Sequence, residues 1–365
     1  MRAILCIHAF LLPAFLYAQD LGLSSSDLRI ELRPDGGYHL FVRYKPDISS
    51  VLLTETTRDP RFREHNYAYR AAERNDINGD EIRLLDGYPI PRESRIYSLV
   101  SSTPQWHSEL GWAYHVYIPH VLYYGYEGGR NGEVQVGDGT YINIRTFYYA
   151  YADYRGPFMD NPFMLHVPQD RPPAAGETYM RETVTAFTGI AGSNTLYANG
   201  SADLVERIKD ILIEENTADT DIVICLDTTG SMRPHIEAIR SQLVDALRGL
   251  IGESASFRIG MVLFRDYYEE YLNRVIPFTA DLDAVQKNLN AVRVGKGGDI
   301  PEAVYEAIHA GATKFPWAAD SRIMILIGDA PPHPRPRGKI TKQMTDDEIA
   351  KQGITVHAII LPQKK

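Results

Sequence analysis

Apolar runs alternate with amphipathic segments throughout the second half of the chain. Short apolar runs predict strands at 221–226, 257–264, 274–278, 322–328 and 354–361. Apolar residues at helical spacing predict helices between them, within 236–250, 282–292 and 304–312. Strands that are apolar on both faces, separated by amphipathic helices, indicate a doubly wound α/β sheet covered on both sides.

The first half shows a different, period-two pattern. Leu28, Ile30 and Leu32 alternate with polar residues, a turn sequence follows at 34–37, and the alternation resumes at Tyr38. This pattern predicts a β-hairpin. Similar alternation recurs near 112–118 and 142–146. We therefore expect a mostly antiparallel β domain of sandwich type. The predicted organisation is a β-rich domain at 19–170, a linker with an amphipathic helix at 171–217, and an α/β domain at 218–365.

The beginning of the chain has the composition of a secretory signal. Arg2 precedes an apolar stretch that ends at Ala18, before polar Gln19. The stretch is shorter than the ~20 residues that span a bilayer, so we expect cleavage after Ala18 and export, with no later transmembrane anchor. The mature protein would be periplasmic, on the cell surface or secreted. Cys225 would be its single cysteine, which excludes a disulfide framework.

Composition narrows the possible partners. The formal net charge of the 365-residue chain is −9, and no Lys/Arg-rich block occurs. A nucleic-acid partner is therefore not expected.

A run of oxygen-bearing side chains follows the strand predicted at 221–226. Asp227, Thr229 and Ser231 occupy alternate positions directly after it. Two acidic segments downstream, GGDIPE around Asp299 and GDAPPH around Asp329, can complete a set of oxygen ligands. Such a set suits a hard divalent cation at the carboxyl edge of a parallel sheet.

These motifs resemble the Asp-x-Ser/Thr-x-Ser pattern of von Willebrand factor A domains, and the whole set resembles the bacterial and α-kinase-associated branch of that family. The resemblance covers about residues 218 to 362. It implies a metal-ion-dependent adhesion site that holds Mg²⁺ (or Mn²⁺/Ca²⁺). Thr229 and Ser231 would coordinate through their hydroxyls, and Asp227 and Asp329 directly or through water. Asp299 departs from the family, because integrin-like members place a threonine ligand in this segment.

The resemblance also raises a question about the edge of the sheet. Family members usually continue beyond the strand equivalent to 354–361 with a helix and an edge strand. Here, either the sheet is one strand short or the 202–215 region and the β domain cover that edge.

Several residues have a structural alternative. Thr229 and Ser231 favour helix N-caps, and Asp299 can cap the helix after Pro301. Arg265 and Asp266 follow a strand end, where they serve either partner recognition or a structural ion pair. His333 is a candidate for orienting a loop or a partner. The histidines of the first half lack zinc-site spacing and are assigned to surface or packed positions, at His65, His107, His115, His120 and His166.

The function predicted from these features is an exported binding module, without catalytic activity, that takes a carboxylate of a protein partner onto the bound cation. A structural envelope scaffold with a fold-ordering metal is the alternative. A Mg²⁺-dependent hydrolase is less favoured, because no phosphate loop or nucleophile elbow is present.

Overall fold

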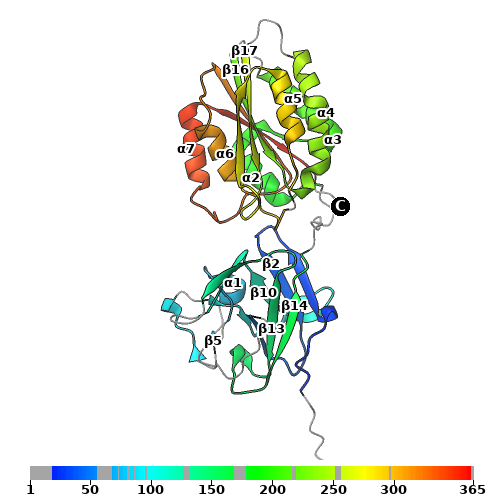
Figure 1. Cartoon of the computed structure of the whole chain (residues 1–365), viewed down its shortest axis with the longest axis vertical. Helices are drawn as coiled ribbons and strands as arrows, with labels where there is room; N and C mark the ends of the chain where they lie inside the picture. Colours follow the sequence, from blue (N-terminus) through cyan, green and yellow to red (C-terminus); the bar gives the residue numbers. More distant parts are fainter. Residues whose placement is uncertain are drawn as a thin grey trace, which may run out of the picture.

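The computed structural model describes residues 19–55, 68–72, 74–79, 83–85, 88–94, 97–125, 131–167, 178–215, 219–250, 256–295 and 297–362. The predicted signal peptide lies outside the described residues. Two bodies follow one another along the long axis of the molecule (Figure 1). We call residues 19–167 the β region and residues 178–362 the α/β region.

The β region contains antiparallel sheets, as the alternating pattern predicts. Within the described residues they have the strand orders β1-β2-β10-β9, β12-β11-β4-β7 and β14-β13-β3-β8, with a small β5-β6 pair. The strands are β1 Leu28–Leu32, β2 Tyr38–Arg43, β3 Ser50–Thr54, β4 Arg70–Ala71, β5 Leu84–Leu85, β6 Tyr88–Pro89, β7 Tyr97–Ser98, β8 Val100–Ser101, β9 Gln105–His107, β10 Gly111–Ile118, β11 Val121–Tyr124, β12 Gly132–Gln135, β13 Tyr141–Phe147 and β14 Phe158–Met164, and the short helix α1 spans Asp76–Gly79.

The hairpin predicted at the beginning of the chain is confirmed. Strands β1 and β2 pair antiparallel, with Leu32 opposite Tyr38 at the turn. The alternating side chains Leu40 and Val42 of β2 are fully buried in the apolar core of this region. Trp106 and Trp112 form a cross-strand pair between β9 and β10, with ring centroids 6.1 Å apart. Both indole side chains are exposed, so this pair does not belong to the core.

The α/β region has the doubly wound architecture that the sequence predicts. Its six-stranded sheet has the order β15-β20-β19-β16-β17-β18, and every neighbouring pair is parallel except β17 and β18. The strands are β15 Thr195–Tyr197, β16 Asp219–Asp227, β17 Ser256–Phe264, β18 Asn273–Thr279, β19 Ser321–Gly328 and β20 Thr355–Ile360.

Helices cover both faces of this sheet (Figure 1). One apolar cluster joins the sheet to α3, α4 and α5, and another joins the opposite face to α2 and α6, against which α7 packs. The helices are α2 Arg181–Ala191, α3 Ser201–Glu214, α4 Arg233–Leu250, α5 Leu282–Ala291, α6 Val304–Thr313 and α7 Lys342–Gln352. Helix α7 was not predicted from the sequence, because it has little apolar periodicity. The signals that mark it are the N-cap Thr341 and the left-handed Gly353 at its end.

The segment assigned to a linker, 171–217, contributes directly to the α/β region. Strand β15 pairs in parallel with β20, so it adds an edge strand beyond the last strand of the chain. Helix α2 packs against β20. The sheet is thus not left with β20 at its edge, and the edge strand is β15, which neither of the two expected alternatives named. None of the helices in the described part of the chain combines the length and apolarity that a membrane crossing requires.

A buried histidine makes the stability of the β region depend on pH. Burial, together with the nearby His39 and Arg33, lowers the pKa of His115 to about 3. The folded state therefore excludes a proton that the unfolded chain binds near pH 6.5. The neutral His115 therefore contributes fully to the free energy of unfolding above pH 6.5. This contribution decreases by about 1.4 kcal/mol per pH unit as the pH falls from 6.5 toward 3.

We expect urea unfolding of the native protein to show this acid-side loss, and His115→Gln to flatten it. His166→Gln is the matched control, because the side chain of His166 is 81% exposed. Equal slopes between pH 6.5 and 4 for native protein and His115→Gln would contradict this assignment.

Candidate functional site

Two neighbouring strand ends bring the predicted metal ligands together. Asp227 ends β16, and Asp329 directly follows the end of β19. These strands are adjacent and parallel, with Leu226 opposite Ile327. The carboxyl ends of adjacent parallel strands meet at one edge, which places both aspartates there.

The turn after β16 adds two hydroxyl groups to this edge. The Thr229 hydroxyl donates to Oδ1 of Asp227 at 2.7 Å, and the Thr229 backbone N–H donates to the same oxygen at 2.8 Å. The Ser231 hydroxyl donates to Oδ1 of Asp329 at 3.0 Å. A short 3-10 turn, Gly230–Met232, then leads into α4, whose positive end lies nearby.

Four of the five predicted ligands therefore form two hydrogen-bonded pairs at adjacent strand ends, Asp227 with Thr229 and Ser231 with Asp329. We call these four residues the strand-end cluster. Ser231 is partly exposed, whereas the other three are at most 1% exposed. Two hydroxyls and two carboxylates are a donor set that fits Mg²⁺ or Mn²⁺.

Asp299 has a different set of neighbours. Its Oδ2 atom accepts the backbone N–H of Gly37 at 2.8 Å, lies 2.8 Å from Nε2 of His120 and accepts a hydrogen bond from Arg337. Gly37 and His120 belong to the β region. Asp299 thus faces the other half of the molecule. One of its oxygens lies within 4.8 Å of a potential ligand atom of His120, in the β region, and of one of Asp266, in the α/β region.

The local sequence explains this placement. The adjacent Ile300 is 1% exposed and belongs to the apolar cluster of the β region. On the other side, the hairpin turn uses Gly36 and Gly37 with φ of +89° and +67°. These conformations favour glycine, and a Cβ at Gly36 would lie 3.2 Å from Oδ2 of Asp299. The hairpin backbone can therefore reach the carboxylate.

Arg337 connects the loops at the carboxyl edge of the sheet. Its guanidinium donates to Oδ2 of Asp266 at 2.8 Å and also to Asp299. Asp266 lies in the loop after β17 and makes a further short contact with Nε2 of His333. Asp266 and His333, the candidate partner-binding residues, are thus both within a buried ion cluster that also includes Asp299 and Arg337.

Arg265 is also engaged within the protein. Its guanidinium carbon lies 4.3 Å from the Tyr271 ring centroid, and its side chain bonds Glu270 and the Arg293 carbonyl. Arg265 is 3% exposed. Its contacts are those of a structural ion pair, which was the alternative to partner recognition for this residue.

The carboxylates of Asp266 and Asp299 have opposite pKa shifts. Burial raises the pKa of Asp266, and the negative charge of Asp299 raises it further. Burial also opposes ionisation of Asp299, but the charges of His120 and Arg337 hold the pKa of this carboxyl below its ordinary value. Burial and the charge of Arg337 lower the pKa of His333 to about 4, so His333 is neutral at pH 7.

Comparison with known proteins identifies the α/β region. A family model described as von Willebrand factor A domain matches residues 221–360. These residues form a von Willebrand factor A domain. The strand-end cluster therefore lies at the edge of this A domain where the sequence resemblance places the adhesion site.

The chain matches only a small part of the length of two curated relatives. The alpha-protein kinase vwkA of Dictyostelium discoideum is 31% identical over 119 residues, which are 31% of this chain and 19% of that protein. The putative ariadne-like RING finger protein R811 of Acanthamoeba polyphaga mimivirus is 25% identical over 119 residues, 33% of this chain and 12% of that protein. An aerotolerance-related membrane protein from Bacteroides fragilis has 19% identity and a TM-score of 0.25, covering 39% of this chain and 90% of that one.

Proposed function

We propose that this protein is an exported, non-catalytic binding module whose A domain captures a protein partner through a divalent cation held by the strand-end cluster. The observation that carries the proposal is that two hydroxyl–carboxylate pairs lie at the ends of adjacent strands. Thr229 and Ser231 would bind the cation through their hydroxyls, and Asp227 and Asp329 directly or through water.

The chemistry of the four side chains supports a cation that can still bind a partner. Hydroxyl oxygens bind Mg²⁺ without cancelling its charge, and Mg²⁺ retains several exchangeable waters. A bound cation therefore supplies an electrophilic position for a carboxylate of the partner. Ser231, the partly exposed member of the cluster, marks the side from which a partner would approach.

The β region affects how a partner reaches this site. Loops at the carboxyl edge of the A-domain sheet contact His120 and Gly37, so the β region lies beside the same edge. We propose that the partner binds next to the β region and not over the whole edge of the sheet.

Calorimetry with Mg²⁺ and Mn²⁺ tests the proposal directly. We expect the mature protein to bind one cation, and Asp227→Ala to weaken this binding at least about 100-fold, because it removes a ligand as well as the acceptor for Thr229. Asp320→Ala, which changes an exposed aspartate of the same domain, should bind as the native protein does. Absence of cation uptake, or equal affinity in Asp227→Ala with an unchanged circular dichroism spectrum, would overturn the proposal.

A further inference from the structure

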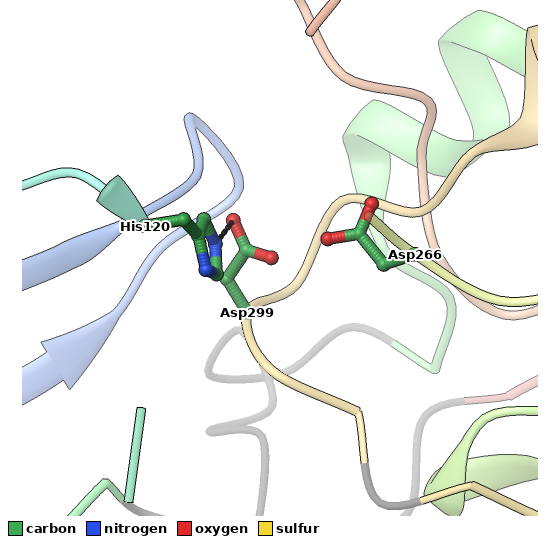
Figure 2. Close-up of side chains that lie close together, drawn as sticks. All are labelled: His120, Asp266 and Asp299. Atoms are coloured by element: carbon green, nitrogen blue, oxygen red, sulfur yellow. Dashed lines mark ion pairs between the residues drawn. The ribbon is translucent and has the colours of Figure 1, made fainter. Parts of the chain in front are cut away.

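The junction between the β region and the A domain gathers a second set of metal-type ligands, apart from the strand-end cluster. It contains His120 of the β region with Asp266 and Asp299 of the A domain. One potential ligand atom from each lies within 4.8 Å of the other two. All three residues are more than nine-tenths buried. Figure 2 shows the imidazole beside one oxygen of Asp299, whose second oxygen is turned toward Asp266.

Tyr38 orients the imidazole of His120 so that Nε2 faces Asp299. The Tyr38 hydroxyl donates its single proton to the Val136 carbonyl at 3.1 Å. The Tyr38 oxygen lies 3.5 Å from Nδ1 of His120 and can therefore only accept from it. A hydrogen bond of this kind orients many metal-bound histidines. Nε2 is the ring nitrogen that faces Asp299, at 2.8 Å from its Oδ2 atom.

Two buried atoms of this set have no hydrogen-bond partner. They are Nε2 of His120 and Oδ1 of Asp299. Nε2 lies 2.8 Å from Oδ2 of Asp299, but the pair does not have hydrogen-bond geometry. Buried polar atoms without a partner are costly, and a cation placed near both atoms would satisfy them.

Arg337 leaves the inner oxygen of Asp299 open. Its guanidinium bonds to the Oδ2 atoms of both carboxylates, whereas Oδ1 of Asp299 is buried and has no hydrogen-bond partner. A cation near Oδ1 of Asp299 would therefore bind without displacing Arg337 from the outer oxygens.

We infer that His120, Asp266 and Asp299 form a metal site that joins the β region to the A domain. One imidazole nitrogen and two carboxylates suit a borderline divalent cation such as Zn²⁺ better than Mg²⁺. Two atoms bound to one tetrahedral Zn²⁺ at about 2.0–2.2 Å lie about 3.3–3.6 Å apart. Ligand atoms that lie within 4.8 Å of one another therefore need to move by about 1 Å to bind one ion.

The surroundings support a ligand-binding role for this junction. The Tyr268 ring stacks on His120 with a centroid distance of 6.1 Å, and Tyr268 has a φ of +69°. A left-handed backbone at a tyrosine is strained, and strain of this kind is concentrated at ligand sites. A cleft of about 560 Å³, lined among others by His120, Tyr268 and Arg337, gives an ion a route from solvent.

The test uses the full mature protein, stripped of metal with a chelator and free of any affinity tag. Calorimetry with Zn²⁺ and absorption spectroscopy with Co²⁺ as a Zn²⁺ substitute measure the affinity and the ligands. We expect tight uptake of one ion by the native protein, and a loss of at least about 100-fold in His120→Gln and in Asp266→Asn.

Two control variants isolate the junction. His107→Gln removes another buried histidine of the β region, which is paired with Glu31 at 3.0 Å, and should bind as the native protein does. Asp227→Ala should also retain this ion, which separates the junction from the adhesion site. The failure of one proposal would therefore leave the other intact.

His120→Cys provides a positive test even if the glutamine variant folds poorly. A thiolate at position 120 should restore binding and add a near-ultraviolet charge-transfer band to the Co²⁺ spectrum. Absence of uptake by the native protein, equal losses in His120→Gln and His107→Gln, or Co²⁺ bound to His120→Cys without that band would each overturn the inference.

Discussion

Replacing Arg337 by methionine should lower the free energy of unfolding by about 3 kcal/mol at pH 7 in the presence of chelator. Arg337 bonds both Asp266 and Asp299, and methionine removes the guanidinium that lies against both buried carboxylates. Removal of one partner of a buried ion pair costs about 3–5 kcal/mol. We expect a loss at the lower end of this range, because Asp266 can take up a proton. Burial and the charge of Asp299 both raise the pKa of Asp266.

Urea unfolding at several pH values measures this effect. The loss should shrink as the pH falls, since protonation of Asp266 removes one of the two charges. Arg335→Met is the matched control, because Arg335 lies in the same loop and is exposed. Its effect should stay within about 0.5 kcal/mol. Similar losses in the two variants would show that the ion cluster does not stabilise the fold.

Ile300→Asp should separate the β region from the A domain. Ile300 lies beside Asp299 in an A-domain loop, but its side chain belongs to the apolar cluster of the β region. A carboxylate at this position would lose its hydration inside an apolar contact, at a cost of about 2–5 kcal/mol. Small-angle X-ray scattering should therefore show a larger radius of gyration, while circular dichroism still reports both folded regions.

Ile213→Asp is the control for this experiment, since Ile213 is 57% exposed on α3. It should leave the radius of gyration unchanged. If Ile300→Asp scatters like the native protein, the junction is held by contacts other than this side chain.

The features that were predicted correctly depend on local patterns. The strands and helices of the A domain were found because buried parallel strands are apolar throughout, and their covering helices have a 3.6-residue period. The proximity of Asp227, Thr229 and Ser231 is also local, since they share one turn. Helix α7 was missed because its surface is largely polar.

The surroundings of Asp299 could not be read from the same patterns. Its segment matches the A-domain motif, which places it with the adhesion-site residues. Its observed contacts come from His120 and Gly37, residues that lie far from it in the sequence. His120 shows no spacing to another ligand type, so nothing in the sequence marks it. The signal that was available is the pair Gly36-Gly37, which permits the backbone of the hairpin to approach a carboxylate.

By itself, the sequence determined the doubly wound A domain, the antiparallel β region before it and the oxygen-rich turn after β16, because each depends on residues that are close in the chain or repeat with a fixed period. Tertiary structure alone decided that β15 completes the sheet and that Asp299 faces His120 across the junction. Both results depend on how surfaces from distant segments pack, and such packing does not produce a periodic pattern in the sequence.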